Sequence, residues 1–211
     1  RLEITSLGRP AHASSPERGF NAIYPMADLL ARLQELAHQL RRREKQENHE
    51  KGRPSLAVTL IQGGSAPNVV PATCTIHLDR RLIPEETADS AEAEIRALAD
   101  AAARACPGAA FEVRRVRVLE PVMVSKQARI VQVVMEAARS LSPPPPALLD
   151  AFPASCDLTW VVHEGGLPGV IWGPGDLHQA HQIDESLRLS ELARAVQGYL
   201  LAGRLWQESV G

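Results

Sequence analysis

Hydrophobic and polar positions divide the chain into two halves with different patterns. The first half has four short runs with strand character: 2–7, 56–61, 73–81 and 111–118. The clearest is 73–81, in which Cys74, Ile76 and Leu78 alternate with polar residues, as in a strand that buries one face. The runs are separated by longer segments of another periodicity.

Two amphipathic helices are predicted between these strands. From about Asn21 to the charged stretch near Asn48, apolar residues recur at steps of three and four: Ile23, Met26, Leu30, Leu33, Leu36 and Leu40. A second helix is predicted from Pro84-Glu85-Glu86 to about Ala105, with acidic residues in its first turn. The order β-α-β-β-α-β over residues 1–118 predicts an α/β (α+β) fold of the ferredoxin-like type.

Residues 119–211 predict an incomplete α/β segment. Helices are expected at 127–141, at 156–163 and after a capping Ser190, and a strand is expected to end at Trp172. The last helix should bury one face: Leu192, Val196, Tyr199, Leu200 and Trp206. Two strands and three helices would leave sheet edges exposed unless more chain completes the unit. Because Arg1 already reads as part of a strand, we expect the sequence to be a piece of a longer protein.

Composition and charge exclude several classes of function. Hydrophobic content is 45% and the formal net charge is −2, which gives no electrostatic case for nucleic acid or an anionic membrane. The basic run Arg41–Arg43 is interpreted as the solvated end of a helix. The sequence has no apolar run of about 20 residues, and we expect no signal peptide. Three widely spaced cysteines predict free thiols in a reducing, cytoplasmic compartment.

The turn Gly173-Pro174-Gly175 introduces the most informative residue, His181. The turn follows an apolar run and presents this imidazole beside Asp184 and Glu185. A histidine at a strand end with nearby carboxylates is a typical metal ligand, although one histidine holds no metal alone. His178 is interpreted as a bystander.

Six motifs occur in order along the chain. They are Gly8-x-x-Ala11-His12-Ala13-Ser14, Gly63-Gly64-x-Ala66-x-Asn68-Val69-Val70-Pro71, Asp79-x-Arg81, Ser155-Cys156-Asp157, Gly173-Pro174-Gly175 and Ala180-His181-x-x-x-Glu185. Together they resemble the zinc-dependent family of acetylornithine deacetylase, succinyl-diaminopimelate desuccinylase, aminoacylase and glutamate carboxypeptidase. The resemblance covers nearly the whole chain.

The resemblance implies a domain organisation and an activity. Residues 1–118 would be the lid (dimerisation) domain, and residues 119–211 the C-terminal part of the catalytic domain, whose N-terminal part is absent. The complete enzyme would be a homodimer joined through the lid. It would use two zinc ions, or cobalt or manganese, to cleave the amide bond of N-acyl amino acids or small peptide-like substrates.

The same resemblance assigns roles to four residues. His181 matches the last metal ligand, supported by Asp184 or Glu185. His12 matches the lid histidine that reaches the partner's active site and stabilises the oxyanion. Asn68 matches a residue near the substrate carbonyl, and Arg81 the arginine that binds a substrate carboxylate. The chain departs from the family at Ser155-Cys156-Asp157, where Gly-Thr-Asp-Ala is commoner. The resemblance therefore does not predict the shape of the acyl pocket at this point.

Structural alternatives exist for three of the four candidates. His12 alone would read as a surface histidine, His181 as a residue that bonds its own loop, and Arg81 as a partner of Asp79 or Glu85. His77-Leu78-Asp79 has the letters of the family's H-x-D ligand pair but lies on the lid strand, so His77 is interpreted as structural. Glu85-Glu86 is likewise interpreted as a helix start, and Cys156 is not expected to be a nucleophile.

The family's other metal ligands and its general base precede the lid, and this sequence does not contain them. We therefore expect the chain to dimerise but not to hydrolyse substrates alone. The alternative is a non-catalytic dimerisation or binding module that keeps a recognition loop without the chemistry.

Overall fold

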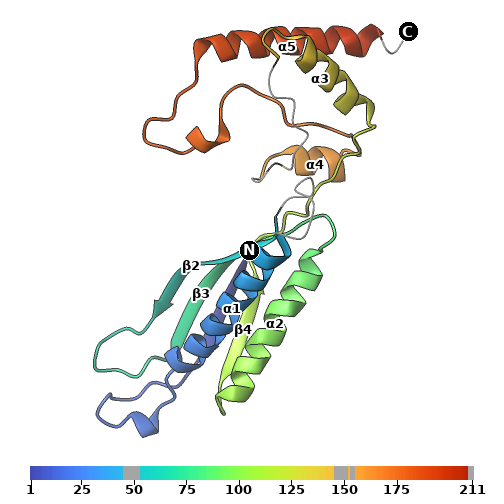
Figure 1. Ribbon diagram of the computed structural model, residues 1–211. Coiled ribbons are helices and arrows are strands. Elements are labelled where there is room, and N and C mark those ends of the chain that lie inside the picture. The colour runs from blue at the N-terminus through green and yellow to red at the C-terminus, as the bar shows by residue number, and fades with distance from the viewer. Residues whose placement is uncertain (45–52, 145–151, 153–154, 209–211) are drawn as a thin grey trace. The chain divides into compact units, whose positions relative to one another are not determined.

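The computed structural model describes residues 1–44, 53–144, 152 and 155–208 (Figure 1). The chain divides into two compact units, Arg1–Pro121 and Val122–Gly211. Each unit has its own packing.

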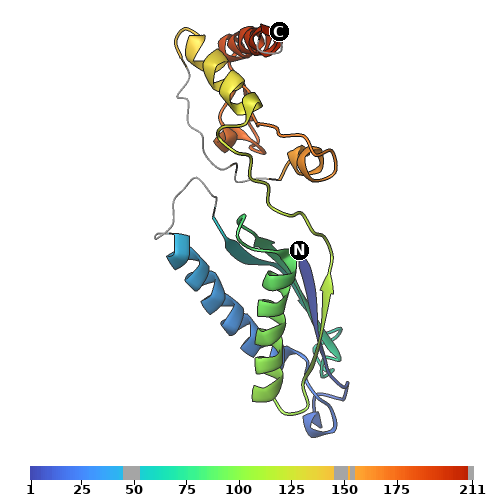
Figure 2. The same cartoon turned by 90° about the vertical axis from the view of Figure 1, so that its right-hand side faces the viewer.

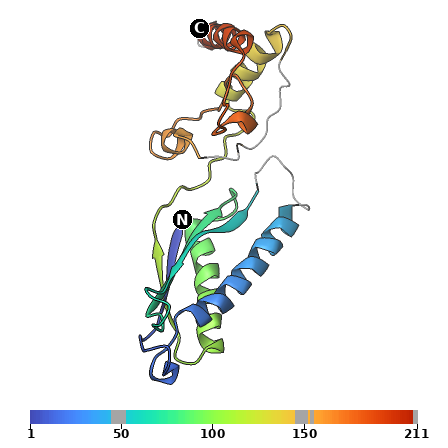
Figure 3. The same ribbon diagram turned by 90° about the vertical axis from the view of Figure 1, so that its left-hand side faces the viewer.

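The first unit contains a four-stranded antiparallel sheet with two helices on one face (Figures 2 and 3). Its strands are β1 (Leu2–Leu7), β2 (Ser55–Gly63), β3 (Thr73–Arg81) and β4 (Ala110–Arg115). Its helices are α1 (Ile23–Glu44) and α2 (Ala88–Ala105). The strand order β2-β3-β1-β4, with a helix after β1 and another after β3, confirms the predicted ferredoxin-like arrangement.

The core of this unit lies between the sheet and the helices. The predicted alternation of β3 is confirmed, since Cys74, Ile76 and Leu78 are each at most 1% exposed. The stripe predicted on α1 is buried at four of its six positions: Met26, Leu33, Leu36 and Leu40. Ile23 at the start of α1 is exposed, and Leu29, outside the predicted stripe, is fully buried instead.

Two predicted boundaries in this unit were wrong. Helix α2 begins at Ala88 and not at Pro84, because Thr87 forms a reciprocal capping box with Ser90 that sets the first turn there. Strand β4 ends at Arg115 and not at 118, because its pairing with β1 stops at Arg115. The predicted end of the first helix near Asn48 lies outside the described residues.

The second unit consists of helices α3 (Arg129–Ser140), α4 (Leu158–His163) and α5 (Leu189–Glu208), with a short 3₁₀ turn at Leu177–Gln179. The predicted strand ending at Trp172 was wrong: the described residues of this unit contain no strand. Trp172 packs instead on α5. A Cβ on Gly198 would lie 2.4 Å from its ring, and Tyr199 donates its hydroxyl to the Trp172 carbonyl at 3.1 Å.

Helix α5 differs from its prediction at its start and along its face. It begins at Leu189, so Ser190 lies inside the first turn, and the carbonyl of Arg188 accepts the first helical N–H groups. The face expected to be buried is exposed, with values from 39% to 71%: Leu192, Val196, Tyr199, Leu200 and Trp206. Across the described ranges, no helix combines the length and apolar character that crossing a membrane requires.

Candidate functional site

Two loops bring His12 and Asn68 together at one end of the sheet. The loop after β1 pairs with the loop before β3: Ala13 donates its backbone N–H to the Asn68 carbonyl at 2.9 Å, and Val70 donates to the Ala11 carbonyl at 2.8 Å. The two predicted catalytic residues of the lid are thus neighbours, although 56 positions separate them in the sequence.

The first loop follows this path because its backbone closely approaches the backbone near Phe20 and Ala72. Gly8 donates its N–H to the Ala72 carbonyl at 2.7 Å, and a Cβ at Gly8 would lie 2.3 Å from the Phe20 carbonyl oxygen. Arg9 and Phe20 exchange two hydrogen bonds of 2.8 Å. The glycine of the first motif therefore closes the loop on which His12 lies.

The ring of His12 is exposed and oriented by Ser14. Its Nδ1 accepts the backbone N–H of Ser14 at 3.2 Å and lies 2.7 Å from the Ser14 hydroxyl oxygen. Because Nδ1 accepts, the neutral ring carries its proton on Nε2. His12 thus presents an N–H donor, which is the group that stabilisation of an oxyanion requires.

Arg81 lies at the end of β3 that is farther from the His12 loop. Thr73, near the His12 loop, and Arg81 are eight steps apart on β3, which corresponds to about 26 Å. The Arg81 guanidinium pairs with Asp79, with Nε 2.6 Å from Oδ1, as the structural alternative for this residue anticipated. An N-acyl amino acid spans roughly 7 Å. One subunit therefore does not bring Arg81 and His12 to the same small molecule.

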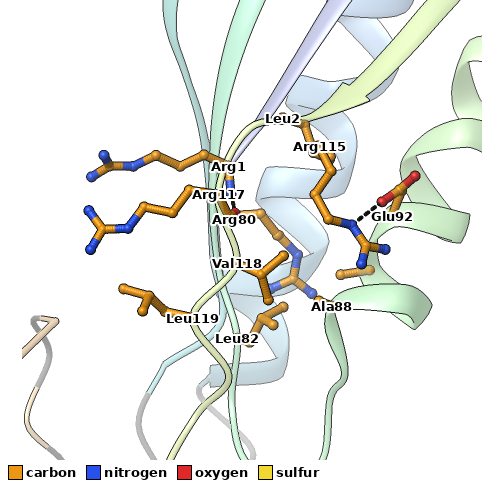
Figure 4. A pocket seen from close by; sticks show the side chains of 11 residues that line it. Arg1, Leu2, Arg80, Leu82, Ala88, Glu92, Arg115, Arg117, Val118 and Leu119 are labelled. Carbon is orange, nitrogen blue, oxygen red and sulfur yellow. Dashed lines mark hydrogen bonds and ion pairs between the residues drawn. The ribbon is translucent and has the colours of Figure 1, made fainter. Parts of the chain in front are cut away.

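A pocket opens at the Arg81 end of the sheet (Figure 4). Its lining combines four arginines with a mostly apolar wall: Arg1, Arg80, Arg115, Arg117, Leu2, Leu82, Ala88, Ala91, Glu92, Val118 and Leu119. Three of the arginines pair with carboxylates: Arg1 with Asp79, Arg80 with Glu86, and Arg115 with Glu92. Their charge is largely balanced, so the pocket gives no strong preference for an anion.

His181 lies on an exposed loop of the second unit, in a left-handed backbone conformation with φ of 64°. Its backbone N–H donates to Glu185 Oε2 at 2.9 Å. Glu185 therefore holds the backbone of His181 in place. A non-glycine residue held at positive φ is uncommon and is often found at functional sites.

The metal-ligand chemistry of the described residues is incomplete. They contain no group of three histidine, cysteine, aspartate or glutamate side chains placed to hold a metal ion. A zinc site needs at least three protein ligands, so His181 and its surroundings do not fit a metal centre by themselves. Cys156 is half-buried just before α4.

Two residues that contact the candidate site residues were not identified from the sequence. Ser14 orients the ring of His12 through its contacts with Nδ1. The only indication of this in the sequence is that Ser14 follows His12 by two residues in the same loop. Arg80 is buried on the helix-facing side of β3, with 4% of its side chain exposed. The signal for Arg80 was a charged residue at the inward position of an alternating strand.

Comparison with known proteins places these features in a family. Residues 1–105 match the family model described as the peptidase dimerisation domain. An acetylornithine deacetylase from Myxococcus xanthus is 27% identical over 192 residues, which are 91% of this chain and 48% of the relative. A probable carboxypeptidase from Aspergillus clavatus is 26% identical over 212 residues, covering 94% of this chain and 41% of the relative. The chain thus spans about half the length of the curated relatives it matches.

Solved structures share the fold. A tripeptidase from Staphylococcus aureus matches with a TM-score of 0.73 at 19% identity, over 95% of this chain and 49% of that one. A di-peptidase from Saccharomyces cerevisiae matches with a TM-score of 0.73 at 13% identity, over 98% and 54% of the two chains. The motifs, the dimerisation domain and these matches agree, and the chain belongs to the M20 family that includes acetylornithine deacetylases and peptidases.

Proposed function

We propose that this chain contributes the lid and the last metal ligand of a metal-dependent amidohydrolase. The enzyme would cleave the amide bond of N-acyl amino acids or small peptide-like substrates, with zinc as its metal. His181 would be one ligand, and the others would come from the half of the family's length that this chain does not span. The observation that carries the proposal is the backbone pairing of the His12 loop with the Asn68 loop, together with the N–H donor that His12 presents.

The separation of His12 from Arg81 supports a homodimeric site. A small substrate cannot reach both residues in one subunit, because about 26 Å of strand lies between their ends of β3. In a dimer, the Arg81 of one subunit and the His12 and Asn68 of its partner can act on the same molecule. Arg81 would hold the carboxylate through its planar guanidinium, and His12 Nε2–H would donate to the oxyanion.

Strand β2 offers the surface for this dimer. Among the described residues it is an edge strand that pairs with β3 alone, and it exposes Val58, Leu60 and Ile61 at 36%, 57% and 55%. Tyr24 at the start of α1 is 70% exposed as well. An apolar edge strand with unpaired backbone groups is a template for pairing with a second copy. We expect Leu60→Lys to give a monomer in light scattering while the helical signal is kept.

Mixed dimers test the proposed function directly. His12→Ala and Arg81→Ala should each lose activity on N-acetyl amino acids in the zinc-loaded, full-length gene product, His12→Ala by roughly 100- to 1,000-fold in kcat. Subunits exchanged at equal amounts should recover about a quarter of the wild-type rate, since half the dimers are mixed and each has one intact site. His178→Ala on the other exposed loop is the matched control and should stay active.

Two results would contradict the proposal. If activity does not recover on mixing, either His12 and Arg81 of one subunit act in the same site, or one of them has no role in catalysis. Deacylase activity with stoichiometric zinc in the 211-residue chain alone would show that the metal centre does not need further ligands.

A non-catalytic dimerisation or binding module is the second candidate. The incomplete ligand set among the described residues favours it. The DNA upstream of the Arg1 codon distinguishes the two candidates. An in-frame H-x-D pair and Glu-Glu pair support the enzyme, and a start codon directly before Arg1 supports the module.

A further inference from the structure

Arg80 is a charged residue at a position where the pattern of β3 calls for an apolar one. Cys74, Ile76 and Leu78 point from this strand toward the helices, and Arg80 follows them on the same face. Only 4% of its side chain is exposed. Figure 4 shows its guanidinium beside Val118 and Leu82, close to the first turn of α2.

The Arg80 guanidinium connects two points of the chain around Arg81. Nη2 lies 2.5 Å from Glu86 Oε1, and Nη1 donates to the backbone carbonyl of Arg81. The other oxygen of Glu86 accepts the backbone N–H of Ile83 at 3.2 Å. The buried pair therefore holds the backbone on both sides of the Arg81-Leu82 step, where β3 ends.

Arg81 is also held at its other end. On the opposite face of the sheet, Asp79 Oδ1 lies 2.6 Å from Arg81 Nε, and Asp79 Oδ2 accepts from Nη2 at 3.4 Å. The backbone and the guanidinium of Arg81 are thus fixed by different partners on different faces. Because β3 stops at this residue, the strand ladder does not hold the chain beyond it.

Stability alone does not account for the buried pair. Replacing a buried ion pair by apolar residues of similar volume is often neutral or stabilising, because desolvation offsets the attraction between the charges. Here Arg80 Nε is in addition buried with no hydrogen-bond acceptor, which is unfavourable. What the pair supplies is geometry at the end of β3.

We propose that Arg80 and Glu86 are a positioning pair for Arg81. They fix the backbone of Arg81 from the helix side of the sheet, and Asp79 orients its guanidinium on the open face. A carboxylate then meets a fork that is already ordered, which reduces the entropy lost on binding. This inference rests on the proposed role of Arg81 as the residue that binds the substrate carboxylate.

The double variant Arg80→Met/Glu86→Met separates positioning from folding. A single substitution would leave Arg80 or Glu86 without its 2.5 Å partner and could unfold the lid, whereas the double variant removes both charges and keeps apolar volume. Asp28→Asn/Arg32→Met is the matched control, since it removes a 2.6 Å ion pair on α1. The readout is the NMR order parameter of the Leu82 backbone N–H bond, which shares a peptide unit with the Arg81 carbonyl that Arg80 binds, in the full chain. Circular dichroism is the test of folding.

We expect the order parameter of the Leu82 backbone N–H to fall from about 0.85 to below about 0.6 in the folded double variant and to stay unchanged in the control. In the full-length enzyme the double variant should raise KM with kcat unchanged, as expected when binding but not chemistry is weakened. An unchanged order parameter in a folded double variant would overturn the inference and leave the pair a purely structural feature.

A titration with N-acetylglycine distinguishes failure of this inference from failure of the proposed function. The Arg81 Nε–H resonance is assigned by its absence from the spectrum of an Arg81→Lys variant. If this resonance does not shift in the wild type, Arg81 does not bind carboxylates and its proposed role fails. The comparison of order parameters still decides whether Arg80 and Glu86 position it.

Discussion

Glu185 accepts the backbone N–H of His181 at 2.9 Å and thereby holds a histidine in the left-handed region of backbone conformation. The two residues are four positions apart in one exposed loop. A side-chain oxygen that accepts this N–H compensates for the unfavourable φ of His181. The carboxylate of the last motif is therefore a backbone anchor for the proposed ligand.

Removing this anchor should loosen the loop. We expect Glu185→Ala to speed hydrogen exchange of the His181 amide about tenfold, because a hydrogen bond to a charged group contributes about 1.5 kcal/mol. Native-state exchange followed by NMR measures it. Glu185→Gln keeps an acceptor oxygen and should show a smaller change. Equal effects of the two substitutions would show that charge, and not the hydrogen bond, holds the loop.

The hydrogen bond from Ser14 to His12 leads to a prediction about the proton on the ring. At a pH where the ring is neutral, ¹⁵N chemical shifts should show the proton on Nε2, because Nδ1 accepts the Ser14 backbone N–H. Ser14→Pro removes this donor and should give a mixture of the two tautomers. Ser14→Ala keeps the backbone N–H and is the control. A ring protonated mainly on Nδ1 in the wild type would contradict the orientation described for His12.

The lid was predictable from sequence because the apolar faces of its strands and helices cover one another. The alternation of β3 and the stripe of α1 are local patterns with a burial partner within the same 121 residues. The predicted ends of elements were wrong where specific side-chain contacts determine them. Thr87 and Ser90 cap α2 four residues later than the prediction from Pro84, and such a capping box is compatible with several registers in the sequence.

The second half was less predictable because its patterns depend on packing partners that the described residues of this unit do not supply. Val170–Trp172 has strand character, but a strand forms only with a neighbour to pair with, and Trp172 packs on Gly198 of α5 instead. The apolar face of α5 was recognised correctly as a pattern, yet its burial needs a surface to cover it. The proposed roles of His12, Asn68, Arg81 and His181 stay predictions.

Glu92 makes the lid sensitive to acid. Burial raises the pKa of Glu92, but hydrogen bonds from Arg115 and Arg96, at 2.5 and 2.8 Å, outweigh burial and hold the pKa below its ordinary value of 4.5. A carboxylate with a lowered pKa in the folded state stabilises the fold above its unfolded pKa, and this contribution is lost as the pH falls through the folded value.

Glu92→Gln should therefore lower the melting temperature at pH 7, and its difference from the wild type should shrink as the pH falls below about 4.5. Thermal unfolding followed by circular dichroism across this range measures it. The exposed substitution Glu17→Gln is the control. A difference that is the same at pH 3 and pH 7 would mean that Glu92 acts through packing and not through its charge.

Cys74 should be the least reactive of the three thiols. It is 1% exposed in the core of the lid, and burial raises the pKa of its thiol, whereas Cys106 and Cys156 are half-buried. Because the thiolate is the reactive form, a maleimide at pH 8 should label Cys106 and Cys156 in the folded chain and all three cysteines in urea. Labelling of Cys74 at the rate of Cys106 in the folded chain would contradict its burial.

Leu33 and Leu200 allow one substitution to be compared in two surroundings. Leu33 on α1 is fully buried, so Leu33→Ala should lower the free energy of unfolding of the lid by about 2–5 kcal/mol. Leu200 on α5 is 71% exposed, so Leu200→Ala should change the stability of its unit by less than about 0.5 kcal/mol. Urea unfolding, followed by tryptophan fluorescence for the second unit and by the NMR signals of β3 for the lid, separates the two. A loss at Leu200 as large as that at Leu33 would show that the exposed face of α5 is covered in solution, and its dependence on protein concentration would tell whether a second copy covers it.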